Sequence, residues 1–296
     1  MRKLLRADLS RLLKNKLFWF LTLCLLVWSA VSSYDNACNL INNPGPYSDI
    51  VIGMGIAVPE SFCFDGGPIV LVIIPVFASM FLGTEFSDGT MRNKIVVGSK
   101  RKNIYLSHLI TTGAASLVFC AMWHIGALSA LPVLGVWKIG VLTWALMVIK
   151  SALFVFAFAS VLCLISHIVA NKAAVAVFEI VFALVVLMAG SMLYNMLLEP
   201  EMISGGVTIS ANENGETVMQ PIEPHPNPDY VAEPERSVLK KALNTLPSGQ
   251  AILLANITSS NEEQLDLPIY SYCASCAIIL VSTAAGIFIF KRKDLK

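Results

Sequence analysis

The chain has 296 residues, of which 56% are hydrophobic and only 14% are charged. A soluble domain carries about 25% charged residues, so this composition excludes an ordinary soluble enzyme, a disordered tail and a basic protein that binds nucleic acid. The net charge of +1 says little about the partners that the protein binds. Long apolar runs recur along the chain, and they predict several membrane spans.

Six apolar runs are long enough to cross a bilayer, whose hydrocarbon core of about 30 Å needs roughly 20 residues of helix. The first run follows six basic residues. We expect a retained anchor there rather than a cleaved signal peptide, because five more runs follow it. The sequence therefore predicts an all-α membrane protein with spans at about 17–33, 68–83, 106–131, 142–167, 172–195 and 268–290.

The basic residues predict the orientation of these spans. Six lie before the first span, five lie in the connection 84–105, one is Lys172, and four lie in the tail 291–296, so one side holds sixteen of the 21 Lys and Arg. By the positive-inside rule this side is cytoplasmic. We therefore expect a multi-pass protein of the cell membrane with both termini in the cytoplasm.

The connection 199–267 is expected to be extracellular and is acidic, with eleven Asp or Glu and three Lys or Arg. Its first half, 205–234, is rich in Gly, Asn and Pro, which predicts irregular structure. Its second half, 237–257, is apolar, and Leu246-Pro247-Ser248-Gly249 divides it into two short helices. Helices of about ten residues do not span, so we expect a re-entrant hairpin that lies on or dips into the outer leaflet.

The connection between the second and third spans predicts a short helix. Asp88 to Thr90 is a helix start, and Gly98 is a stop. An apolar face is formed by Met91, Ile95 and Val96, and two basic residues, Arg92 and Lys94, project elsewhere. We expect an amphipathic helix across the inner membrane face, and the alternative is a positively charged loop with no further role.

The residues of this connection, with features elsewhere, resemble one transporter family. The pattern is Glu85-x-x-x-Gly89-Thr90-x-Arg92, then Gly98-x-x-Arg101, then Tyr105-Leu106-Ser107. A basic amphipathic segment precedes the first span, the run Leu246-Pro247-Ser248-Gly249-Gln250-Ala251 precedes the sixth, and the tail is basic. Together these resemble the ABC-2 superfamily of ATP-binding-cassette exporter permeases, and its lantibiotic and bacitracin immunity branch in particular. The outer connection is longer than in the compact permeases of that branch.

The resemblance implies a division of labour between this chain and its partners. Residues 85–101 would be a coupling segment that docks on a separate ATPase subunit, and residues 2–16 an amphipathic elbow helix beside it. ATP would be bound by the partner, because no phosphate-binding G-x-x-x-x-G-K-[ST] motif occurs in this chain. A second permease copy, identical or homologous, and membrane lipid would be the other partners. The implied ATPase-coupling residues are Glu85, Gly89, Thr90, Arg92, Lys94 and Arg101.

The implied substrate is an amphipathic peptide, an antibiotic or a lipid-like molecule moved out of the cell membrane. Within the spans, Glu179 and Lys150 are possible pathway residues. Their expected depths differ by about 15 Å, so we expect Lys150 to snorkel outward rather than to pair with Glu179. A non-ABC channel, or an intramembrane enzyme that uses Glu179 and His167, is the alternative function.

Overall fold

A computed structural model describes residues 1–42, 59–135, 140–169, 171–203, 207–211, 217–221, 224–256 and 268–293. Six of its helices are long and apolar enough to cross a membrane, which supports a helical transmembrane protein with several spans. They overlap the six predicted runs. Their bounds are α2 (Lys16–Asn42), α5 (Gly67–Ser87), α7 (Arg101–Ala127), α9 (Val141–Val169), α10 (Lys172–Leu198) and α13 (Ile269–Arg292).

The first of these helices is longer than its apolar run predicts. The helix α2 continues nine residues past Ser33 through polar sequence, and Asn39 donates to the carboxylate of Asp35 at 3.1 Å on its surface. Apolar length indicates how much helix a bilayer can cover, but it does not fix where the helix ends. Shorter helices are α1 (Arg2–Leu13), α4 (Pro59–Asp65), α6 (Thr90–Val96), η1 (Leu128–Ala130), α8 (Leu131–Leu134), α11 (Glu235–Thr245) and α12 (Pro247–Ala255).

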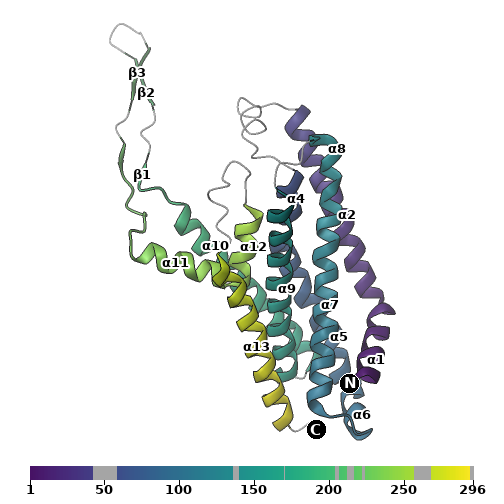
Figure 1. Cartoon of the computed structure of the whole chain (residues 1–296). Coiled ribbons are helices and arrows are strands. Elements are labelled where there is room, and N and C mark those ends of the chain that lie inside the picture. Colours follow the sequence, from purple (N-terminus) through teal and green to yellow (C-terminus); the bar gives the residue numbers. More distant parts are fainter. Residues whose placement is uncertain are drawn as a thin grey trace.

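The helices α7 and α9 form the centre of the bundle. They pack against each other and against α13, while α2 packs on α7 and α10 packs on α5. Figure 1 shows that the start of α1, the helix α6 and the end of α13 all lie at one end of the bundle. The outer faces of α2, α10 and α13 carry exposed large apolar side chains such as Trp28, Met188 and Leu280. Faces of this kind need lipid or another protein to cover them.

A two-stranded arm projects from the opposite end, beyond α10 (Figure 1). Here β1 (Met202–Ile203) pairs with β4 (His225–Pro226), and β2 (Val207–Ala211) pairs with β3 (Thr217–Pro221), both antiparallel. The prediction of irregular structure over 205–234 is therefore wrong for these strands. Val207, Ile209 and Val218 are β-branched residues of high strand propensity, and their local pattern outweighs the Gly, Asn and Pro content of the segment.

The helices α11 and α12 confirm the predicted division at Pro247. Leu246 is extended, with φ −73° and ψ 134°, as a residue before proline prefers. The helix α12 packs against α5, α9 and α10, and Ser248 Oγ donates to the carbonyl of Val186 at 2.7 Å. Gln250 is fully buried and donates to the carbonyl of Ser271 at 3.2 Å. Thus α12 belongs to the packed bundle.

A close approach between α7 and α13 gives a test of this packing. A Cβ at Gly286 would overlap the ring of Tyr105, which is fully buried. We expect Gly286→Ala to lower the free energy of unfolding by about 1–3 kcal/mol, as overpacking does. Denaturant titration of the purified protein in detergent measures this change. Gly140→Ala is the control, because the nearest atom to its Cβ is Thr143 Oγ1 at 3.9 Å, and an equal loss there would contradict the expectation.

Candidate functional site

The end of the bundle that holds the start of α1, the helix α6 and the end of α13 is called the basic end below. Two buried carboxylates lie there and share one ammonium group. Asp8 on α1 is 2% exposed and Glu85 on α5 is 1% exposed. The side chain of Lys94 on α6 donates to Asp8 Oδ1 at 2.7 Å and to both oxygens of Glu85 at 2.8 Å. Buried carboxylates are tolerated only when they are paired and hydrogen-bonded. Lys94 therefore connects three helices through one charged group.

Further contacts complete the cluster. Arg11 on α1 forms an ion pair with Glu85 Oε1, and its guanidinium lies 3.9 Å from the ring centroid of Phe81. Ser107 on α7 donates to Asp8 Oδ2 at 2.5 Å. His108 Nε2, also on α7, lies 2.9 Å from Glu85 Oε2. These contacts fix α1, α5, α6 and α7 relative to one another, and the cluster of Asp8, Arg11, Glu85, Lys94 and His108 is called the ion cluster below.

Two glycines bring Lys94 back to Glu85, nine positions earlier in the chain. Gly89 is the N-cap of α6 and has φ +69°, and Gly98 follows α6 with φ +89°. Both values lie in the left-handed region that glycine adopts without strain. The first turn reverses the chain after α5, and the second directs it into α7. Thr90 Oγ1 also donates to the carbonyl of Glu85 at 3.1 Å, which secures the first turn.

A histidine pair extends the ion cluster toward α9. His108 Nδ1 lies 3.2 Å from His167 Nε2, and His167 Nδ1 lies 2.7 Å from the carbonyl of Cys163. Because a carbonyl only accepts, His167 donates from Nδ1 and its Nε2 accepts from His108. The rings of Phe86, Tyr105 and Phe290 surround His167 with centroids 4.7 to 5.6 Å away. This pair is enclosed by aromatic side chains and links α7 to α9.

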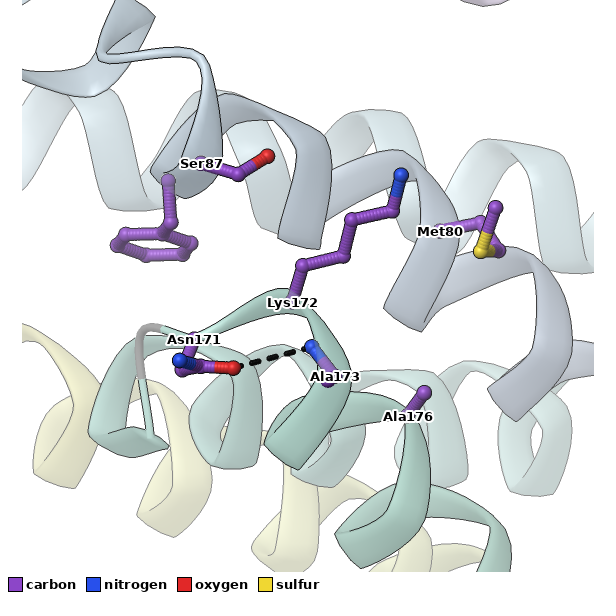
Figure 2. A pocket seen from close by; sticks show the side chains of 7 residues that line it. Met80, Ser87, Asn171, Lys172, Ala173 and Ala176 are labelled. Atoms are coloured by element: carbon purple, nitrogen blue, oxygen red, sulfur yellow. Dashed lines mark hydrogen bonds between the residues drawn. The ribbon is translucent and has the colours of Figure 1, made fainter.

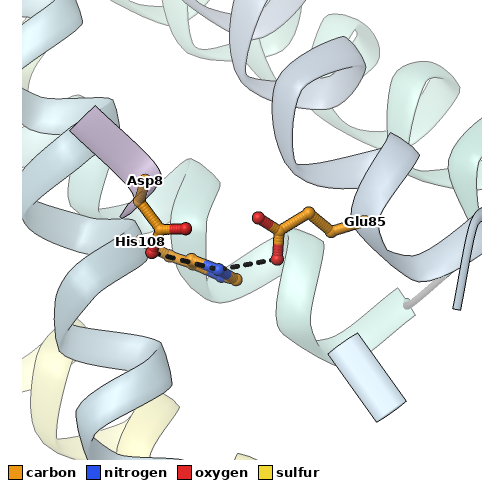
Figure 3. Close-up of side chains that lie close together, drawn as sticks. All are labelled: Asp8, Glu85 and His108. Atoms are coloured by element: carbon orange, nitrogen blue, oxygen red, sulfur yellow. Dashed lines mark ion pairs between the residues drawn. The ribbon is translucent and has the colours of Figure 1, made fainter. Parts of the chain in front are cut away.

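The ion cluster also has the composition of a metal site. Ligand atoms of Asp8, Glu85 and His108 lie within 4.8 Å of one another, and Figure 3 shows the three side chains converging. However, Lys94 Nζ lies within 2.7 to 3.2 Å of an atom of each of them. A metal ion would have to displace this ammonium, which already supplies the positive charge. The arrangement therefore fits a structural ion cluster better than a metal centre.

A second feature of the same end is an open groove of about 560 Å³ between the end of α5 and the start of α10 (Figure 2). Lys172 projects across it, and Asn171 caps α10 by accepting from Ala173 N at 3.1 Å. Met80 and Phe86 line its apolar part. The lining residues include no carboxylate, histidine or cysteine.

The predicted coupling residues lie in four different surroundings. Glu85 and Lys94 are inside the ion cluster, so the prediction that Lys94 projects away from the packed face together with Arg92 is wrong. Gly89 forms the turn, whereas Thr90 and Arg92 are exposed on α6. Arg101 donates to the carbonyl of Phe290 at 3.1 Å, at the end of α13. The predicted apolar face is also corrected, because Met91 is buried but Val96 is 78% exposed.

The possible pathway residues are both buried. Glu179 accepts from Ser166 at 2.5 Å, and its other carboxylate oxygen has no hydrogen-bond partner in the part of the chain that the structure describes. Lys150 is 1% exposed, so the expectation that it snorkels outward is wrong. Among the described residues no hydrogen bond joins Glu179 to His167, which bonds to His108 and Cys163 instead.

Cys38 and Cys63 are both thiols, and Cys63 Sγ donates to the carbonyl of His124 at 3.9 Å.

No family model matches this chain, and no curated protein matches it. Function is therefore inferred from the geometry of the chain itself.

Removal of one charge tests whether the ion cluster holds this end together. Lys94→Met leaves Asp8 and Glu85 buried with one cation fewer. We expect the free energy of unfolding to fall by about 3–5 kcal/mol, the usual effect of breaking a buried ion pair. Denaturant titration followed by Trp fluorescence measures this loss.

The matched control is Arg92→Met, which removes the same charge from the same helix at an exposed position. Its effect should stay within about 0.5 kcal/mol, as for most surface substitutions. Equal stability of the two variants would show that Lys94 does not hold the end of the bundle.

Proposed function

We propose that this chain is the permease subunit of an ATP-driven exporter of the ABC-2 type, and that a separate subunit binds and hydrolyses ATP. The observation that carries the proposal is the position of α6. This short helix is exposed on one side and is tied on the other side, through Lys94, to Glu85 on α5 and Asp8 on α1. A force applied to α6 therefore reaches two neighbouring helices.

The exposed side of α6 has the character of a docking surface. Arg92 is exposed, and Val96 and Val97, about one helical turn further along the chain, are 78% and 85% exposed. Arginine beside apolar side chains is the composition that protein interfaces favour. In this proposal Thr90 and Arg92 contact the ATPase, Gly89 sets the turn, and Glu85 and Lys94 transmit the motion.

The remaining contacts at this end carry the motion further. Arg101 binds the carbonyls at the end of α13, and Lys293 donates to the carbonyls of His167 and Ile168 at the end of α9. A rigid-body step of the ATPase would thus be passed to α5, α7, α9 and α13 together. The basic end faces the cytoplasm in this proposal, α1 serves as the elbow helix, and α12 serves as the re-entrant element.

The outer faces of α2, α10 and α13 favour a second permease copy, identical or homologous, since one chain leaves these faces uncovered. The proposed substrate is an amphipathic peptide, an antibiotic or a lipid-like molecule. The connection 199–267 has eleven acidic and three basic residues, and a field of this sign attracts cationic peptides. In this proposal the two-stranded arm attracts cationic peptides and raises their concentration at the outer surface.

Coupling is tested with two variants that separate docking from transmission. Arg92→Glu should lower the affinity for the co-purified ATPase subunit by about tenfold, equivalent to about 1.4 kcal/mol. Glu85→Gln leaves the exposed side of α6 unchanged, so it should lower substrate-stimulated ATP hydrolysis more than it lowers binding of the ATPase subunit. Pull-down in mild detergent followed by an ATPase assay measures both quantities.

Lys14→Glu is the control for Arg92→Glu, because Lys14 is exposed at the same end but lies outside α6. It should bind the ATPase subunit as the parent protein does. A chain that co-purifies with no ATPase, or full stimulation in both Arg92→Glu and Glu85→Gln, would contradict the proposed function.

The substrate class is tested by shortening the arm. Deletion of 207–221 removes the paired strands β2 and β3 between two residues that face each other, Val207 and Pro221. Resistance to cationic peptides should fall, and its dependence on salt should weaken, because screening acts on the charge that was removed. Growth assays at two ionic strengths measure this. Unchanged resistance with unchanged salt dependence would exclude a role of the arm in attracting cationic peptides.

A further inference from the structure

A basic pocket of about 670 Å³ lies where the start of α1 meets the turn between α6 and α7. Four exposed cations line it, Arg2 and Lys3 from α1 and Lys100 and Lys102 from the turn and the first residues of α7. Its lining contains no carboxylate. Among the residues that the structure describes, none of these cations has a carboxylate oxygen within 4.0 Å.

Three other cations at the same end have protein partners. Arg11 and Lys94 pair with buried carboxylates, and Arg101 binds backbone carbonyls of α13. The four cations of the basic pocket instead face one another across a shared space, where like charges repel. The helix α7 begins beside them without a side-chain cap, and the positive end of its dipole adds to the field. A bound anion would relieve this repulsion.

We propose that the basic pocket binds the phosphate headgroup of an anionic membrane phospholipid. Its position favours a lipid over a soluble phosphate, because the apolar span of α7 begins at Arg101, directly beside the pocket. Met1 and Leu4 give the lining apolar surface as well, which suits the first carbons of an acyl chain. This binding does not depend on the proposed transport function.

The test uses the full chain in an uncharged detergent. Phosphatidylglycerol in mixed micelles is the probe, native mass spectrometry measures its binding, and phosphatidylcholine and inorganic phosphate are the reference ligands. The variant Lys100→Gln with Lys102→Gln should weaken phosphatidylglycerol binding by about 25-fold, since each basic residue near an anionic lipid contributes about fivefold. Both side chains are exposed, so the fold should tolerate the change.

The control variant, Lys14→Gln with Lys16→Gln, removes the same charge just beyond the far end of α1, whose residues Arg2 and Leu13 are separated by roughly 17 Å of helix rise. Its binding should change by less than about twofold, because salt screens charges at that distance. An equal loss in the control, or equal binding of phosphatidylcholine, would overturn the proposal by showing a non-specific interaction. Displacement of the lipid by inorganic phosphate at equal concentration would overturn it in favour of a soluble anion.

Discussion

The packing of the helices at the basic end of the bundle depends on two buried carboxylates. Asp8 and Glu85 lie 2% and 1% exposed among apolar helices, where an uncompensated charge costs several kcal/mol. The requirement for cations within hydrogen-bond distance fixes the positions of Lys94 and Arg11. Since these residues come from different helices, one electrostatic constraint determines how α1, α5 and α6 meet. The apolar faces alone would leave their rotation and sliding far less specified.

This constraint gives α6 two unlike sides. Its inward side carries Met91 and Lys94, which are packed or paired, and its outward side carries Arg92 and Val96, which are exposed. A seven-residue helix has little stability of its own. Its rigidity therefore comes from the ion cluster and from the glycine turns at either end. A helix that is short, exposed and tightly held is suited to transmit a displacement rather than to absorb it.

Much of the fold follows from the sequence, because a span needs only sufficient apolar length. The six spans could be predicted in this way, whereas the short helix near 90–96 was predictable from its start and stop residues and the break at Pro247 from the proline. The partners of the ion cluster could not, since Lys94 and Asp8 are 86 positions apart and pairing at that distance leaves no local pattern. One feature of the sequence indicated a special role for Asp8. It is the only acidic residue among the first sixteen, which include six basic residues.

The direction of Lys94 could have been inferred from helical spacing. Met91, Lys94 and Ile95 stand at i, i+3 and i+4, which places them on one face. Because lysine is usually exposed, the sequence predicts Val96 rather than Lys94 on the packed face. The pairing of Lys94 with buried carboxylates of other helices overrides this usual exposure. The strands at 207–211 and 217–221 show the same effect at a smaller scale. Composition predicted loops there, whereas the β-branched residues of the strands determined the structure.

The sixteen basic residues that the sequence assigns to one side of the six spans do not act as one electrostatic feature. Lys94 and Arg11 neutralise buried carboxylates, while Arg101 and Lys293 bind carbonyls at helix ends. Only the remainder is available to attract anions from solvent or membrane. A count of Lys and Arg therefore overstates the surface charge of that side. The cations of the basic pocket matter for this reason, because they are concentrated where the protein itself supplies no counter-charge.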